Sequence, residues 1–499
     1  MGSKLTRRRF LAAVSSGAAY LALLNTAGCE PARPNRATGS PGRPEQTWSF
    51  RSRPDLSPPA VELTARAHST APGYIFVAPE GKGDAGQGGS MILDDSGQVV
   101  WFRPPQGTRR RAMDLKVQTY RGKPVLTCVE TPGEYVIFDD SYREIARFRA
   151  GNGYLGDHHE FLISPQDTAL ITIYNPVPWD LSPLGGPKDG RVWEGIVQEL
   201  DIESGEVLFE WRSFEHVGLE ETYATLRQDG RPGFDYFHIN SIDVDHDSNL
   251  LVSARETFSV YKIDRTSGEV IWRLGGKKSD FEMGPGTRFA FQHDARRQPD
   301  GTLTIFDNGT TVFDNDTPRA VEESRAIVVE LDEEKMRASL VGEYTHPDKQ
   351  YADAGGNMQV LANGNVFVGW GRALVISEFS SDGELLFDAR LPPQNRSYRA
   401  FRFRWSGYPG DQPAAVAERA SEDEVRVYAS WNGATEVAAW EVLAGPRPGQ
   451  LESVGSAPRD GFETAMLVQT SEPYVGVQAK SRSDRVLGTT ELINMLQRD

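Results

Sequence analysis

The sequence predicts an all-β protein, a six-bladed β-propeller followed by a β-sandwich-like segment at its C-terminal end. One hairpin design recurs along most of the chain, and no stretch of that region sustains the 3.6-residue period of a helix. The composition, 38% hydrophobic with 49 glycines and 31 prolines, is typical of a turn-rich globular protein rather than of a disordered one.

Residues 1–29 have the pattern of a twin-arginine export signal. Arg7 and Arg8 precede a mild apolar run that ends near Leu24 and is too short to span a membrane. The letters TAGC then resemble a bacterial lipobox, with Cys29 as the acylated residue. We therefore expect export to the periplasm or the cell surface, with the lipid on Cys29 as the membrane attachment. Residues 30–50, rich in Pro, Gly and Arg, are expected to form a flexible linker.

Residues 60–405 contain the repeats that predict the propeller. Four copies of one hairpin are closely similar: DDSGQVVWF (94–102), IESGEVLFEW (202–211), RTSGEVIWRL (265–274) and SSDGELLFDA (380–389). Each has a turn with glycine and then an alternating strand. A second hairpin type, such as GTLTIFDNG (301–309), precedes most of them, so that two hairpins form a four-stranded unit. Six such units indicate radially repeated sheets.

Residues 410–499 follow a different pattern. Strands such as EVRVYASW and YVGVQAK alternate at the spacing of a small β-sandwich, and this part has no candidate catalytic cluster.

Charge and cysteine content exclude two classes of protein. The net charge of −16 and the pI near 5.1 argue against nucleic acid as the main partner, because phosphate binding requires a basic surface. The only cysteines are Cys29 and Cys128, so no disulfide framework holds the fold, and we expect Cys128 to be a buried thiol.

Four polar residues are predicted to meet in the propeller's central channel. Alignment of the blades on their turns gives His159, Asn240 and His293 equivalent positions, and His238 lies two residues before Asn240 on the same strand face. In a propeller the first strand of each blade lines the channel. In a regular strand His158 would point the other way from His159.

Arg255 belongs to the same predicted site, because a charged residue closing an apolar strand is costly unless it reaches water or an anion. Imidazoles act as nucleophiles or move protons, and arginine holds oxyanions. Two other functions remain open at this point. A surface propeller would bind an anionic or glycan ligand without chemistry, and a metal-dependent hydrolase would use the histidines as ligands, although Arg255 would oppose a cation.

Three blocks of the sequence resemble a known family. They are DYFHINSIDVDHDSNLLVSARETF (235–258), FAFQHDARRQPDGTLTIFDNG (289–309) and GNMQVLANGNVFVGWG (356–371). They are similar to the bacterial arylsulfotransferases that do not use the nucleotide sulfate donor, and the resemblance covers about residues 70–405. It implies a six-bladed propeller that moves a sulfuryl group from a phenolic sulfate ester to a phenol by ping-pong chemistry.

The resemblance also implies roles for individual residues. His293 would be the nucleophile that becomes a sulfohistidine, and His238, Asn240 and Arg255 would line the sulfate pocket together with His159 or His158. The implied partners are a small phenolic sulfate donor and a phenol acceptor, with no metal and no organic cofactor. One feature departs from the family, whose best-known members dimerise and carry a β-sandwich before the propeller. Here the additional β segment follows it.

Overall fold

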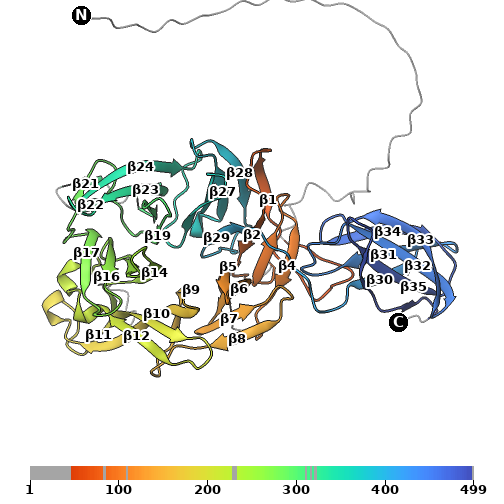
Figure 1. The fold of residues 1–499 in the computed structure, drawn as a ribbon, viewed down its shortest axis with the longest axis horizontal. Helices are drawn as coiled ribbons and strands as arrows, with labels where there is room; N and C mark the ends of the chain where they lie inside the picture. Colours follow the sequence, from red (N-terminus) through yellow and green to blue (C-terminus); the bar gives the residue numbers. More distant parts are fainter. Residues whose placement is uncertain are drawn as a thin grey trace, which may run out of the picture. The chain divides into compact units, whose positions relative to one another are not determined.

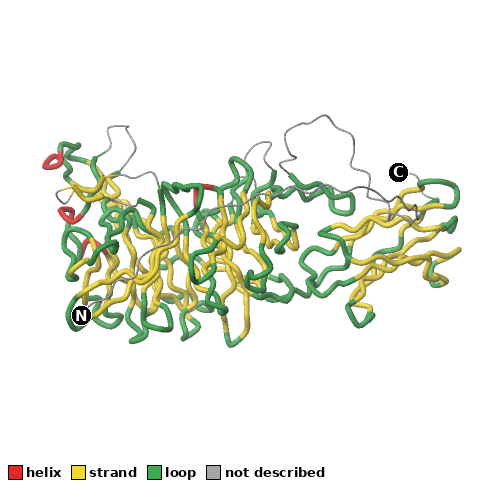
Figure 2. The backbone as a smooth tube through the Cα atoms, turned by 90° about the horizontal axis from the view of Figure 1, so that it is seen from above, coloured by secondary structure: helices red, strands yellow, loops and turns green. Residues whose placement is uncertain are grey.

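The computed structural model describes residues 47–81, 86–107, 111–226, 233–309, 312–314, 317–319 and 323–496. The predicted export signal, with Arg7, Arg8 and Cys29, and nearly all of the predicted linker lie outside these residues. Within them, no helix has the length and apolarity needed to cross a bilayer. Their helical elements are short 3-10 turns, and strands dominate the tube in Figure 2.

Six sheets surround a common axis in the described chain (Figure 1). Given from the inner strand outward, the first sheet is β29 (Ala400–Phe403), β2 (Tyr74–Val77), β3 (Ser90–Leu93) and β4 (Val99–Arg103), and the second is β5 (Ala112–Tyr120), β6 (Lys123–Glu130), β7 (Glu134–Phe138) and β8 (Glu144–Phe148). The third sheet is β9 (Gly156–Ile163), β10 (Thr168–Trp179), β11 (Gly190–Asp201) and β12 (Val207–Arg212), with β13 (Phe234–Asp235) beside β11, and the fourth is β14 (Ile239–Val244), β15 (Leu250–Ala254), β16 (Ser259–Ile263) and β17 (Val270–Gly275). The fifth sheet is β19 (His293–Arg297), β20 (Leu303–Asp307), β23 (Arg325–Asp332) and β24 (Arg337–Thr345), with β18 (Glu282–Met283) beside β24. The sixth is β25 (Asn357–Val360), β26 (Val366–Gly369), β27 (Val375–Phe379) and β28 (Leu385–Arg390), with β1 (Glu62–Arg66) on its outer edge.

These sheets confirm the predicted all-β propeller. Its two ends interlock, because β29 pairs with β2 as the inner strand of the first sheet while β1 pairs with β28 outside the last. Strands in the middle of a sheet are buried on both faces, as β7 is along its whole length. The apolar clusters accordingly join neighbouring sheets: Ile137 and Phe161 belong to one cluster, and Val260 and Ile327 to another. The free thiol of Cys128 is buried in β6, as expected.

Two further sheets form the sandwich-like segment. One comprises β30 (Ala414–Arg419), β31 (Glu424–Ser430) and β34 (Glu463–Gln469). The other comprises β33 (Gln450–Pro458), β32 (Ala439–Arg447), β35 (Tyr474–Lys480) and β36 (Val486–Thr489), with β37 (Ile493–Asn494) beside β35. Val427 of the first sheet and Trp440 and Val477 of the second share one apolar core.

A buried ionic network lies where the inner strands converge. The guanidinium of Arg399, fully buried just before β29, meets Asp114 of β5 at 3.0 Å, Glu160 of β9 at 3.2 Å and Asp294 of β19 at 3.2 Å. Lys116 adds contacts of 2.8 Å to Asp114 and 2.6 Å to Glu160. Arg296 also pairs with Glu160 and lies 2.8 Å from Asp294. Three cations thus balance three anions, which is the condition for burying charges at tolerable cost.

β-bulges direct two of these carboxylates inward. The register of β5 shifts between Met113 and Lys116, and that of β19 between His293 and Arg296. Asp114 and Asp294 lie within these bulges with φ of 53° and 54°, a left-handed conformation that is strained for residues other than glycine. The ion pairs to Arg399 compensate for this strain.

We predict that Arg399→Ala lowers the free energy of unfolding by about 3–5 kcal/mol, because it leaves buried carboxylates without their counter-ion. Arg396→Ala is the matched control, since Arg396 lies on the same segment, is 34% exposed in its side chain and pairs with Glu80, so a loss of at most about 1 kcal/mol is expected. Urea unfolding of both variants measures the difference. Equal losses would mean that the network does not stabilise the ring.

Candidate active site

Three imidazoles from three neighbouring sheets lie together near the axis of the ring. His159 belongs to β9, His238 directly precedes β14, and His293 begins β19. The ring centroids of His159 and His238 are 5.1 Å apart. The Tyr398 ring lies near two of the histidines, with its centroid 5.3 Å from that of His159 and 6.0 Å from that of His293. The structure therefore brings together the three histidines that the sequence placed in one register.

His293 is the most enclosed of the three, with 1% of its surface exposed. Its Nδ1 lies 2.6 Å from Oδ1 of Asn308 and 3.0 Å from the carbonyl oxygen of Phe291, and its Nε2 accepts a long hydrogen bond of 3.3 Å from the backbone N–H of Gly355. Burial and the nearby Arg255 guanidinium lower the pKa of His293 well below its ordinary value. The ring is therefore neutral near pH 7, the state in which an imidazole is nucleophilic.

Asp157 holds both histidines of the DHH sequence. Its carboxylate contacts Nδ1 of His159 and lies 3.3 Å from Nδ1 of His158. The expectation that His158 points away is wrong, because the two rings stack at 4.3 Å. The reason is a large register shift: Phe161 pairs with Ile171 and Gly156 with Ile173, so residues 157–160 bulge out of the regular strand.

The two stacked imidazoles differ in their protonation. Burial lowers the pKa of His159 to about 4, despite the opposing attraction of Asp157. For His158, whose side chain is 36% exposed, burial is outweighed by the Asp157 carboxylate, and its pKa is raised. The pair therefore combines a neutral inner ring with an outer ring that retains a proton more readily.

His238 has its own carboxylate, because its Nδ1 lies 2.5 Å from Oδ2 of Asp235. Its φ of 55° places it in the left-handed region, a strained backbone of the kind found at functional sites. The Tyr174 ring of β10 lies 5.4 Å from His238 and 5.3 Å from His159, and its hydroxyl donates to the carbonyl of Ile239 at 2.7 Å.

Asn240 is fully buried beneath these rings. Its Nδ2 donates to the carbonyl of Gln292 at 2.6 Å, while its Oδ1 has no hydrogen-bond partner among the described residues. The unpartnered atom of Asn240 is therefore an acceptor, which suits a hydroxyl or an N–H.

Arg255, which directly follows β15, supplies the positive charge. One Nη contacts the carboxylate of Glu256, the other donates to the carbonyl of Asp353 at 3.3 Å, and the buried Nε has no hydrogen-bond partner within the described chain. The guanidinium carbon lies 4.8 Å from the centre of the Phe291 ring. An unpaired guanidinium N–H beside a neutral imidazole can hold an anion.

Asp157, His158 and His159 could hold a metal ion, since their ligand atoms lie within 4.8 Å of one another. Both imidazole Nδ1 atoms already contact the carboxylate oxygens, so an ion would have to displace these two contacts.

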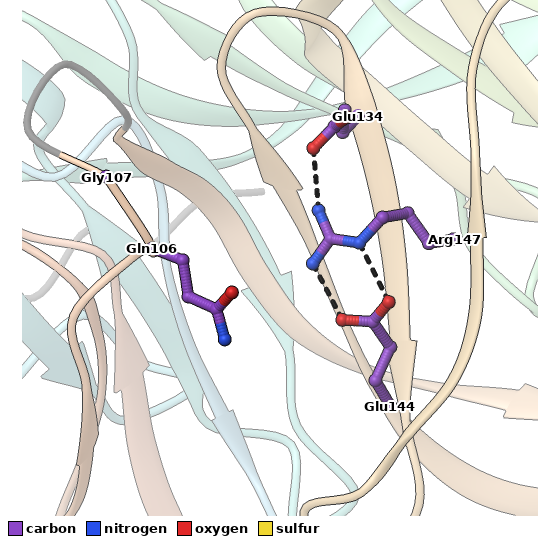
Figure 3. A pocket seen from close by; sticks show the side chains of 5 residues that line it. All are labelled: Gln106, Gly107, Glu134, Glu144 and Arg147. Carbon is purple, nitrogen blue, oxygen red and sulfur yellow. Dashed lines mark hydrogen bonds and ion pairs between the residues drawn. The ribbon is translucent and has the colours of Figure 1, made fainter.

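A cavity of about 530 Å³ lies elsewhere, between the loop that follows β4 and the sheet of β5–β8, and no residue of the histidine cluster lines it. Figure 3 shows the Arg147 guanidinium between the carboxylates of Glu134 and Glu144, at 2.8 and 2.7 Å. These ion pairs satisfy the charges that line the cavity.

The sequence reasoning missed five residues of the site, namely Asp157, Tyr174, Asp235, Asn308 and Tyr398. Two signals were available, since Asp157 directly precedes the histidine pair and Asp235 lies three residues before His238. Tyr398 gave no signal, because it lies on the segment that closes the ring from the far end of the propeller.

Comparison with known proteins identifies one family. The family model described as Arylsulfotransferase (ASST) matches residues 116–391, more than half of the chain. None of the curated proteins matches the sequence.

Solved structures match more weakly. A protein of unknown function from Bacteroides caccae is 13% identical, with 67% of this chain and 100% of that chain covered and a TM-score of 0.40. An inactive variant of virginiamycin B lyase from Staphylococcus aureus with quinupristin is 9% identical, with 75% and 97% covered and a TM-score of 0.35. A streptogramin B lyase is 12% identical, with 66% and 86% covered and a TM-score of 0.35. Nothing about the site follows from similarities this low.

We predict that His293→Gln makes stability less dependent on pH. Below the ordinary histidine pKa of about 6.5, the unfolded chain binds a proton that the folded His293 does not, so the free energy of unfolding falls as the pH falls. Removing this group should reduce the pH slope of the free energy of unfolding by up to about 1.4 kcal/mol per pH unit below about pH 6.5. Urea unfolding across this range measures the slope, with His246→Gln, at an exposed histidine, as the control. Equal slopes for wild type and His293→Gln would show that His293 is protonated in the folded protein.

Proposed function

The chain belongs to the arylsulfotransferase family, and on that premise we propose that it transfers a sulfuryl group from a phenolic sulfate ester to a phenol through a covalent intermediate on His293. One observation carries the proposal: the buried, neutral imidazole of His293 lies beside the guanidinium of Arg255, which has an unpaired N–H. Two further imidazoles, those of His159 and His238, lie in the same cluster. A nucleophile, an anion holder and proton carriers are what such a transfer requires.

In the first half-reaction, the lone pair on Nε2 of His293 attacks sulfur. The sulfur–nitrogen bond forms as the bond from sulfur to the aryl oxygen breaks, and the departing phenolate takes a proton from the His158–His159 pair. Arg255 and His238 hold the remaining sulfuryl oxygens. Nδ1 of His293 keeps its hydrogen, so the sulfated ring carries a positive charge that offsets the sulfonate.

In the second half-reaction, the acceptor phenol gives its proton to the same histidine pair and attacks sulfur. The sulfur–nitrogen bond breaks, and His293 returns to its neutral form. His159 has an unprotonated Nε2 near neutral pH because its pKa is lowered to about 4, so it can relay the phenol proton but is too weak a base to keep it. His158 is the more exposed ring and its pKa is raised, so it suits proton storage and exchange with solvent.

The acceptor oxygen of Asn240 fits the phenol rather than the sulfate. Its Nδ2 is bound to the Gln292 carbonyl, so the buried Oδ1 is the group that can orient an incoming hydroxyl. The substrate's sulfuryl group is already activated as an ester, so this reaction needs no organic cofactor.

We predict that mixing the protein with p-nitrophenyl sulfate, without an acceptor, adds the mass of one sulfuryl group and releases an equal amount of nitrophenol. Intact-mass spectrometry and absorbance measure the two products. His293→Ala should abolish both, whereas His246→Gln should leave both unchanged because His246 is exposed outside the cluster. Transfer to an added phenol without any adduct would contradict the covalent route. Sulfate binding with no turnover of any donor would favour a binding propeller instead.

We predict that Arg255→Gln lowers kcat/KM by roughly 10²–10³-fold, the usual effect of removing one charged group that stabilises a transition state. Inhibition by inorganic sulfate should weaken in the same variant. Arg372→Gln is the matched control, because Arg372 is a nearby, half-exposed arginine whose ion pair is with Asp353. Equal effects of the two substitutions on kcat/KM and on sulfate inhibition would show that Arg255 does not bind the anion.

A further inference from the structure

Asn308 is buried against His293, and its amide has a defined orientation. Its Nδ2 donates to the carbonyls of Ala352 at 2.9 Å and Gly355 at 2.8 Å, so its other atom, Oδ1, is the one that faces Nδ1 of His293 at 2.6 Å. With 1% of its surface exposed, Asn308 has no water to exchange these contacts with. The side chain therefore presents a fixed acceptor to the imidazole.

We infer that Asn308 is the positioning residue of the nucleophile: it holds the hydrogen of His293 on Nδ1 and so leaves the lone pair of Nε2 available for sulfur, without adding a negative charge. The inference rests on the proposed function for the role of His293. It assigns Asn308 a part that neither the family match nor the sequence motifs supply.

The surroundings of the His293 ring favour this tautomer on both sides. Nδ1 has two oxygen acceptors, Oδ1 of Asn308 and the Phe291 carbonyl, which require a hydrogen on that nitrogen. Nε2 instead meets a donor, the Gly355 N–H, which requires a lone pair there. That bond is long, at 3.3 Å, so a substrate can displace it at little cost.

The site uses carboxylates for its other inner histidines. Asp157 contacts His159 and Asp235 contacts His238 at the same ring nitrogen, Nδ1. A carboxylate behind His293 would stabilise the imidazolium and raise the pKa of the ring, whereas an amide fixes the tautomer alone. When the sulfur–nitrogen bond forms, positive charge develops on the ring, and the Nδ1–H bond to Asn308 strengthens.

Charged and titratable groups from four other segments face His293. They are Arg255 after β15, His238 before β14, His159 in β9 and Tyr398 before β29. Asp294, the next residue on β19, pairs with Arg399 and Arg296 in the ionic network. The cations near His293 therefore oppose its protonation, and Asn308 does not counteract them with a charge.

The first experiment needs no variant and no activity. Protein labelled with ¹⁵N-histidine reports the tautomer of each ring by NMR, and the His293 signals are assigned by their loss in His293→Gln. We expect the Nδ1–H form for His293, and an Nε2–H form would overturn the inference. An Nδ1–H form in a protein that accepts no sulfuryl group from any donor would contradict the proposed function and support the positioning.

The second experiment follows the pH dependence of sulfuryl transfer in two variants. Asn308→Ala should lower the rate on the order of 10- to 100-fold at every pH, as removal of a partner that orients an imidazole does elsewhere. Asn308→Asp should shift the acid limb of kcat/KM to higher pH, because the carboxylate stabilises the protonated, non-nucleophilic ring. A role in packing alone would lower the rate without moving the limb.

Asn357→Asp is the matched control for burying a carboxylate. Asn357 is equally buried, and among the described residues its amide bonds only to Ala400, so the pH profile of Asn357→Asp should be that of the wild type. An unshifted limb in a folded Asn308→Asp protein would contradict the inference. So would the same shift in Asn357→Asp.

Discussion

The ion pairs of Arg399 with Asp114, Glu160 and Asp294 are the constraint on which the site depends. Each anion comes from the inner strand of a different sheet, so one guanidinium ties three strands together where no water can compete. The residues of the site are chain neighbours of this network: His159 precedes Glu160, His293 precedes Asp294, and Tyr398 precedes Arg399. Arg399 also donates to the carbonyl of Asn240 at 2.9 Å. The network therefore fixes the spacing of the imidazoles above it, and the cost of the strained backbone at Asp294 contributes to placing His293.

The groups that contact each imidazole give these chemically identical side chains different protonation states. The ring centroids of His159 and His238 are 5.1 Å apart, and those of His159 and His293 are 5.3 and 6.0 Å from that of Tyr398, so the three imidazoles would titrate alike if their surroundings were alike. Burial beside Arg255 keeps His293 neutral, and Asp157 allows the His158–His159 pair to hold a proton. The same residue type can then serve as nucleophile and as proton carrier in one small site.

The propeller was predictable because its cause is local. Each hairpin has its own turn glycine and its own alternating strand, and repeated hairpins of this kind form the sheets of the propeller. Counting residues back from the turns also located His159 and His293, which belong to the inner strands β9 and β19. Regular spacing did not indicate the bulges: the bulge over residues 157–160 turned His158 toward His159, and the bulges at Asp114 and Asp294 contribute carboxylates to an ionic network that no periodic pattern indicates. The roles of Asn308 and Tyr398 were not predictable from the sequence for another reason. Their partners come from other strands, and only the closed ring brings them together.

The central claim is that the enclosed, uncharged His293 receives the sulfuryl group, while its neighbours handle charge and protons. Its most direct test is to locate the modified atom: the protein is mixed with a phenolic sulfate ester, quenched in alkali within one turnover, digested, and its peptides are fragmented by mass spectrometry. The account predicts sulfation of His293 in the FAFQHDARR stretch alone. Modification of His159, His238 or a tyrosine in its place, or transfer with every peptide unmodified, would contradict it.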